Sequence, residues 1–125
     1  MTLKIIENYD EMDEIERLKI TMGNILGWVI DEKGSFRSPE IHLPRVVIER
    51  IQHFKKFCEE INDFYLQMFI LAYDEVEVKK LFCTQFSEKK WLPVSEDFKA
   101  WRDEGNDCHP TEIAVALIYG GELEE

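Results

Sequence analysis

The sequence predicts a mainly α-helical protein: a compact single-domain bundle of about five helices, with a short strand or hairpin near the N-terminus as an open feature. Three observations favour this fold class. Apolar residues recur at alternating spacings of three and four, which keeps them on one face of a helix. Helix starts carry a capping residue followed by an acid. The 125 residues contain no repeat, linker or low-complexity segment, and this length suits one domain. A mixed α+β fold is the alternative.

The central segment Leu43–Tyr73 is expected to form the core helix around which the other elements pack. Pro44 suits the first turn of a helix, and the stretch from Phe64 to Tyr73 is so apolar that we expect cover on every side. A continuous helix would span about 45 Å, so a break is expected at Asn62-Asp63. A buried strand over 64–73 is the alternative to a helix there. The predicted inward face consists of Val47, Ile51, Phe54, Cys58, Ile61, Tyr65, Met68 and Ala72.

The N-terminal part is expected to contain one short apolar segment and one long helix. Thr2–Ile6 has the pattern of an edge strand or of an extended arm packed on the core. A helix is predicted over Tyr9–Ile30, with Asn8 as its cap and several acids in its first turn, where the helix dipole favours negative charge. Its predicted apolar face consists of Ile15, Leu18, Met22, Ile25 and Val29.

A rival interpretation ends that helix early. In it Gly27–Asp31 is a strand that forms a hairpin with Ser35–Arg37. Otherwise Asp31–Leu43 is a connection between the two helices. Gly23 and Gly27 weaken a helix by about 1 kcal/mol each relative to Ala, which indicates that another element approaches closely there.

The C-terminal half is expected to hold three further helices. They cover Glu75–Phe86, a stretch capped by Ser95 and ended by Gly105, and Pro110–Ile118. A short strand over Glu75–Val78 is the alternative start, and Ser87–Val94 is a predicted loop. The globular domain is expected to cover residues 1–121, and residues 122–125 to form a loose acidic tail.

The charge of the chain favours a basic partner. The net charge is −11, and residues 95–125 hold nine acids and only two bases. Nucleic acid and anionic membranes are therefore not expected as direct partners, because their charge repels this surface. The acid excess is typical of a solvated surface that aids solubility. The sharper interpretation is a patch that attracts a basic protein.

Composition also indicates a compartment. Cys58, Cys83 and Cys108 are an odd number with no close pair, which favours reduced thiols and a cytoplasmic location. No secretory signal is apparent at the N-terminus. The longest apolar run has about ten residues, too few to span a bilayer. We therefore expect a soluble intracellular protein.

Evidence for catalysis is thin. Cys108 and His109 are the weak catalytic candidates, because a thiol just before a helix N-terminus is easier to ionise and an adjacent imidazole can act as a base. A polar loop before a helix-starting proline explains the same residues. No cofactor or metal is expected: the cysteines and histidines lack zinc spacing, and no glycine-rich nucleotide motif or serine nucleophile motif occurs.

The leading functional hypothesis is a small protein-binding module, specifically an inhibitor or immunity-type protein that occludes a basic partner such as a nuclease or toxin. This is an analogy of size and charge alone. Trp91, in a loop, is expected to be exposed, whereas the spacing of Phe98 and Trp101 is also typical of a core. The predicted binding residues are Trp91, Asp97, Trp101, Asp103, Glu104, Asp107 and Glu112. A thiol-dependent enzyme and a structural or homo-oligomeric subunit are the alternatives.

Overall fold

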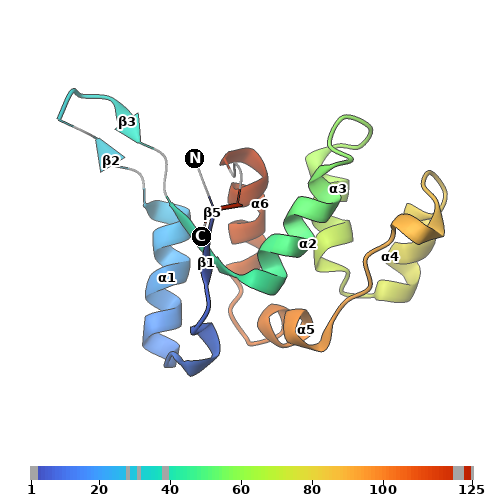
Figure 1. Ribbon diagram of the computed structural model, residues 1–125, viewed down its shortest axis with the longest axis horizontal. Coiled ribbons are helices and arrows are strands. Elements are labelled where there is room, and N and C mark those ends of the chain that lie inside the picture. Colours follow the sequence, from blue (N-terminus) through green and yellow to red (C-terminus); the bar gives the residue numbers. More distant parts are fainter. Residues whose placement is uncertain (1–2, 28, 31, 38–39, 120–122, 125) are drawn as a thin grey trace.

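The fold is mainly α-helical, as predicted, with a small parallel sheet (Figure 1). The computed structural model describes residues 3–27, 29–30, 32–37, 40–119 and 123–124. Along the long axis α1 lies at one end and α4 at the other, with α6, α2 and α3 between them (Figure 1). The elements are β1 Leu3–Ile6, the 3-10 helix η1 Tyr9–Glu11, α1 Glu14–Leu26, β2 Val29–Ile30, β3 Phe36–Arg37, β4 Ile41–Pro44, α2 Arg45–Lys55, α3 Asp63–Leu71, α4 Glu75–Phe82, the 3-10 helix η2 Glu88–Lys90, α5 Glu96–Arg102, α6 His109–Tyr119 and β5 Leu123–Glu124.

The sheet brings distant segments together in the order β4-β1-β5, with both pairs parallel. Strand β1 is therefore central, and the predicted edge position is wrong. Leu3 pairs with Ile41 on one side and with Leu123 on the other. The predicted connection over 31–43 thus contains most of β4. The predicted loose tail contains β5, while residues 122 and 125 lie outside the described residues.

The first helix is shorter than predicted at both ends. It begins at Glu14 because the carboxylate of Asp13 accepts a hydrogen bond from the Glu16 amide, whereas Asn8 makes no side-chain cap. The rival hairpin is confirmed: β2 pairs with β3 in antiparallel fashion and extends away from the helices (Figure 1). A methyl group added at Gly23 would meet nothing within 4 Å, so the close approach predicted there is not made within the described part of the chain.

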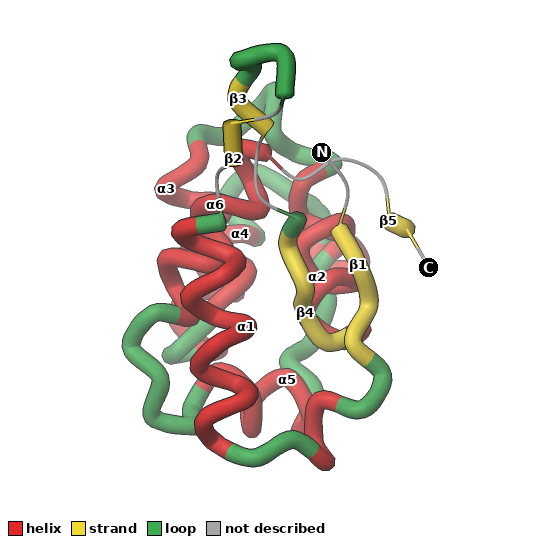
Figure 2. The backbone as a smooth tube through the Cα atoms, turned by 90° about the vertical axis from the view of Figure 1, so that its left-hand side faces the viewer, coloured by secondary structure: helices red, strands yellow, loops and turns green. Residues whose placement is uncertain are grey.

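Helix α1 also faces the opposite way to the prediction. It packs beside β4 and α6 (Figure 2), but the side chains of Ile15, Leu18 and Met22 are exposed. Thr21 and Asn24 are buried in their place. Asn24 is held inward because its side chain bonds the backbone of β4, accepting from the amide of His42 and donating to its carbonyl.

The central segment is divided into α2 and α3, and the predicted break is confirmed. The helix predicted over 64–73 is confirmed as far as Leu71, where α3 ends. Asn62 caps α3 by accepting a hydrogen bond from the Tyr65 amide. The turn between the helices resets the helical phase, so the predicted face does not continue. Cys58 and Tyr65 are exposed, and Phe64 is 68% exposed, so the cover expected on every side of this stretch is absent. The buried side chains of α3 are Leu66, Phe69, Ile70 and Leu71.

The remaining caps are mostly as predicted. Asp74 accepts from the Glu77 amide at the start of α4, and Ser95 accepts from the Phe98 amide at the start of α5. Both helices end a few residues earlier than expected, at Phe82 and Arg102. The last helix starts one residue before the expected Pro110, at His109. Local sequence thus determined the helix starts better than the helix ends.

Two buried arginines bind the carbonyl end of α3. Arg50, from α2, donates to the carbonyl oxygens of Ile70 at 2.6 Å and Phe69 at 3.0 Å. Arg102, from α5, donates to those of Leu71 at 2.9 Å and Ala72 at 2.8 Å. The last carbonyls of a helix have no partner within the helix, so these side chains satisfy groups that would otherwise be buried unpaired.

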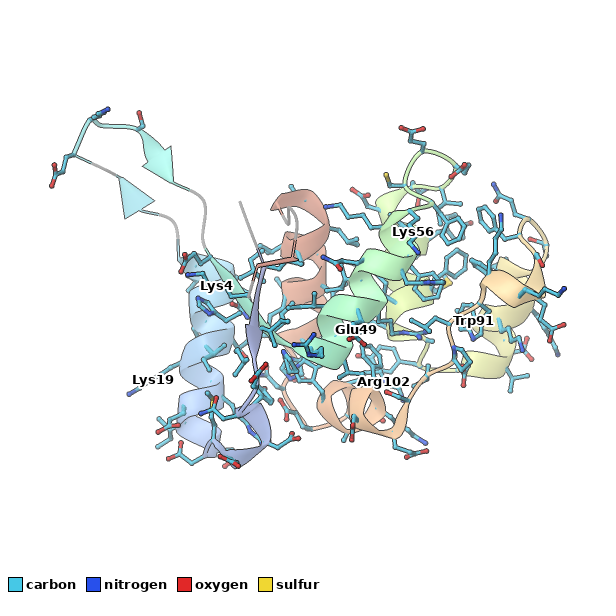
Figure 3. The ribbon with its side chains drawn as sticks, viewed as in Figure 1. Lys4, Lys19, Glu49, Lys56, Trp91 and Arg102 are labelled. Atoms are coloured by element: carbon cyan, nitrogen blue, oxygen red, sulfur yellow. The ribbon has the colours of Figure 1, made fainter. Side chains whose placement is uncertain are left out.

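An aromatic cluster surrounds Arg50. Its guanidinium lies over the rings of Phe54, Trp91 and Phe98, with distances to the ring centres of 5.0, 5.5 and 5.1 Å. Phe82 packs edge-on against Phe54 and is fully buried. Figure 3 shows Trp91 between α2 and α4. The cation is therefore enclosed by carbonyls and aromatic faces, both of which attract positive charge.

We predict that Arg50→Met lowers the free energy of unfolding by about 3 kcal/mol or more, because the carbonyls it serves stay buried without donors. Chemical denaturation with urea measures this change. Lys56→Met is the matched control on an exposed side chain and should change the free energy of unfolding by about 0.5 kcal/mol or less. Equal effects of the two substitutions would contradict this role for Arg50.

Candidate functional site

An acidic groove of about 540 Å³ lies on the surface. It is lined by the end of β1, by η1, and by the first turns of α2 and α5. Four exposed carboxylates line it, those of Glu7, Asp10, Glu49 and Asp97. Its apolar lining comes from Ile6, Pro44, Val46 and Trp101. We call this hollow the acidic groove.

The fold brings these residues together through long-range pairing. Strands β1 and β4 are in register at Ile6 and Pro44, so Glu7 and Arg45 leave the sheet side by side. The guanidinium of Arg45 lies 3.5 Å from the Glu7 carboxylate. Glu49, on helix α2, is labelled in Figure 3 and also lines the groove. The first turn of α5, which packs on α2, supplies the opposite wall.

The charges of the groove are poorly balanced. Arg45 is the single basic side chain among the lining residues, and it faces Glu7. Asp10, Glu49 and Asp97 make no ion pair among the described residues. Three exposed carboxylates therefore have no basic side chain paired with them among the described residues, and they give the groove a negative potential that favours a cationic ligand.

A buried polar network supports the groove from below. The Tyr9 hydroxyl donates to Glu104 at 2.7 Å, and Arg17 donates to the second oxygen of Glu104 at 3.1 Å. Burial, and then the adjacent Glu104 carboxylate, raise the pKa of Tyr9, so its hydroxyl remains a donor. The ring of Trp101 stacks on His109, with ring centres 3.9 Å apart. The floor of the groove is thus fixed in position.

His109 is occupied on both sides and is not available to activate Cys108. Its Nδ1 contacts Glu112 and its Nε2 lies 2.5 Å from Glu104. Both ring nitrogens are therefore in hydrogen-bond contact with carboxylates. The ring is completely buried, whereas Cys108 is partly exposed and its amide bonds the side chain of Asn106. The adjacency of Cys108 and His109 in sequence therefore does not form a thiol–base pair.

The seven predicted binding residues do not form one surface, because they lie in different environments. Asp97 and Trp101 line the acidic groove, although Trp101 is only 4% exposed. Glu112 is 1% exposed and accepts from the Asn24 side chain, so the prediction that it faces a partner is wrong. Glu104 belongs to the polar network described above, and Asp107 is exposed in the loop before α6.

Asp103 forms a bidentate ion pair with the neighbouring Arg102, at 2.8 and 3.0 Å. The hydrogen bond from Arg102 holds the pKa of Asp103 below its ordinary value. This carboxylate is half exposed, but its charge is already compensated.

Trp91 is buried, and its predicted exposure is wrong. Its indole nitrogen donates to Glu75 at 3.0 Å, and the Val94 amide donates to the same oxygen at 2.9 Å. Partial burial raises the pKa of Glu75, but these two hydrogen bonds and nearby positive charge outweigh it, and the pKa is lowered. The Trp91 loop is thus fastened to α4.

Sequence reasoning missed Glu7, Asp10, Arg45 and Glu49. They lie in two separate segments, residues 7–10 and 45–49, and only the pairing of β1 with β4 brings these together. The available signal was weak: Glu49 is a single acid in a predominantly apolar and basic helix. The acidic C-terminal third therefore contributes one wall of the groove and not the whole surface.

Within the described residues, no group of three or more histidine, cysteine or acidic side chains is arranged to hold a metal ion. No helix in the same part of the chain is both long and apolar enough to cross a membrane. The chain matches no family model, no curated protein and no solved structure with which we compared it. The site must therefore be interpreted from its own geometry.

We predict that Glu75→Gln flattens the acid limb of the stability curve. Because the folded-state pKa of Glu75 is lowered, its carboxylate contributes stability that is present above the unfolded pKa of about 4.5 and is lost as the pH falls through the folded value. Urea denaturation at a series of pH values between about 7 and 3 measures this. Glu59→Gln, on an exposed turn, should keep the wild-type slope. An unchanged slope for Glu75→Gln would show that the indole contact does not hold the carboxylate.

We also predict that His109→Leu lowers the free energy of unfolding by about 3 kcal/mol or more, because it leaves two carboxylates without their shared donor. Cys108→Ser, one residue earlier, should cost about 1 kcal/mol or less. Thermal or urea unfolding of the two variants provides the comparison. Similar losses would mean that the network around His109 contributes little.

Proposed function

We propose that the protein binds a basic segment of another protein in the acidic groove, and so acts as an inhibitor or immunity-type protein that occludes a partner such as a nuclease or toxin. The observation that carries this proposal is the set of three exposed groove carboxylates that pair with no basic side chain in the described part of the chain.

The lining of the groove suits the chemistry of lysine and arginine side chains. Their charged heads would meet Asp10, Glu49 and Asp97, and their aliphatic stems would lie along Ile6 and Val46. A lysine or arginine held between two walls would make hydrogen-bonded ion pairs in a partly desolvated site. Such pairs are stronger than those on an open surface.

The overall charge supports capture over distance. A net charge of −11 attracts a basic protein and raises its association rate, which then falls as salt screens the field. A nuclease presents a basic surface to bind phosphates. An acidic protein that covers such a surface would block its substrate, and this is how occlusion would inhibit the partner.

The test compares three forms of the protein as bait in extracts of the native host. The groove variant carries Glu49→Lys with Asp97→Lys. The control carries Glu59→Lys with Glu60→Lys on an exposed turn away from the groove. Both double substitutions change the net charge equally, so a difference between them reports the groove and not the total charge. Bound proteins are identified by mass spectrometry.

We expect a basic protein that the wild type and the control retain and the groove variant loses. The purified partner should associate at least about tenfold more slowly at 200 mM than at 20 mM salt. It should also lose its activity when the wild-type protein is added. Equal retention by all three baits, or the absence of any basic protein from the wild-type capture, would overturn the proposal.

A further inference from the structure

Helix α1 exposes its apolar face, the reverse of an ordinary surface helix. The apolar side chains are spaced three, four and four residues apart, so they form one continuous stripe about 16 Å long. Their exposed fractions are 66%, 51%, 40% and 65%, respectively. The residues of this α1 stripe are Ile15, Leu18, Met22 and Leu26.

The polar face of α1 is locked inward, so the stripe cannot be buried by rotating the helix. Asn24 bonds the backbone of β4 through both atoms of its amide. The Thr21 hydroxyl accepts from the side chain of Asn106 at 3.0 Å, and Arg17 reaches Glu104 at 3.1 Å. Turning the apolar side inward would break all of these bonds at once.

A hollow of about 380 Å³ lies beside the N-terminal half of the stripe. Ile15 and Leu18 form its apolar wall, and Glu14 and Asp107 are exposed carboxylates at its edge. Neither carboxylate makes an ion pair among the described residues. Gly105, which also lines the hollow, has a φ of +85°, a backbone conformation that favours glycine, and it adds no side chain to block entry.

We propose that the α1 stripe and this hollow bind an amphipathic helix of a partner protein, with its apolar face on the stripe and lysine or arginine side chains at its edge facing Glu14 and Asp107. An amphipathic helix laid into an apolar groove is a recurrent mode of recognition, with anchors three and four residues apart. The stripe has this spacing.

Charge complementarity selects a basic helix over a second copy of this chain. Asp13, Glu14 and Glu16 surround the first turn of α1, and Asp107 lies across the hollow. Arg17 is the one basic side chain among the lining residues of the hollow, and it is already paired with Glu104 at 3.1 Å. A second copy would bring the same acids and a further net charge of −11. A basic amphipathic helix would both compensate the negative charge of these acids and cover the apolar α1 stripe.

This surface is separate from the acidic groove, because the two hollows share no lining residue. The inference therefore goes beyond the proposed function and can fail independently of it. The probe is an 18-residue amphipathic helical peptide made of leucine and lysine. One control peptide replaces lysine with glutamate, and a second has the same composition in a scrambled order without a helical apolar face.

Binding is measured by fluorescence anisotropy, with the protein titrated into labelled peptide. The stripe variant carries Leu18→Gln with Met22→Gln, and both positions are exposed, so the fold should be retained. The matched control carries Phe64→Gln with Val76→Gln, which removes exposed apolar side chains elsewhere. The groove variant Glu49→Lys with Asp97→Lys separates this surface from the acidic groove.

We expect the leucine–lysine peptide to bind with a Kd below about 100 μM and the two control peptides to bind at least tenfold more weakly. The stripe variant should lose at least tenfold in affinity, whereas the matched control and the groove variant should stay within about threefold of the wild type. Amide hydrogen exchange should slow in α1 when the peptide is added.

Three results would overturn the inference. The first is equal binding of the helical and scrambled lysine peptides, which would indicate attraction by charge alone. The second is loss of binding in the groove variant but not in the stripe variant. The third is self-association of the wild type in sedimentation equilibrium that the stripe variant abolishes, because a second copy would then occupy the stripe.

Discussion

The carbonyl end of α3 is the constraint on which the rest of the structure depends. Its last carbonyls are buried, where an unpaired oxygen is costly, and Arg50 and Arg102 reach them from two other helices. Burying a guanidinium also has a cost, since burial lowers the pKa of Arg50 to about 10, although it remains charged at neutral pH. The buried carbonyls need donors and the buried guanidinium needs acceptors, so each group offsets the cost of burying the other. No buried side-chain nitrogen or oxygen among the described residues lacks a hydrogen-bond partner.

The same contacts shape the acidic groove. Arg50 also donates to the carbonyl of Leu92 at 2.6 Å, which ties the segment before α5 to α2. That tie sets the first turn of α5, and therefore Asp97, opposite Glu49. On the other side, the stacking of Trp101 on the buried His109 fixes the floor. A surface that would bind a partner thus rests on a rigid polar interior, which reduces the entropy lost on binding.

Features set by a few neighbouring residues could be predicted from the sequence, and features set by distant partners could not. The caps formed by Asp74 and Ser95 depend on an amide three residues away and were found. The sheet, in contrast, requires β1 to pair with strands far along the chain. Helix α1 has a regular apolar period, but that period marks its exposed side, because Asn24 bonds Glu112, 88 residues away. Composition rules assign arginine to the surface, so the role of Arg50 was also missed. The groove residues on β1, η1 and α2 could not be predicted for the same reason, because only the tertiary fold brings these segments beside α5.

The most direct test of this account is the state of the Arg50 side chain in solution, observed by NMR of the ¹⁵N-labelled protein. If Arg50 binds the carbonyls of α3, its Nε–H should exchange with solvent as slowly as the amides of the core helices. Its Nη groups should give separate signals, because hydrogen bonds hinder rotation of the guanidinium. A single averaged Nη signal that exchanges as fast as that of the exposed Arg45 would contradict the account.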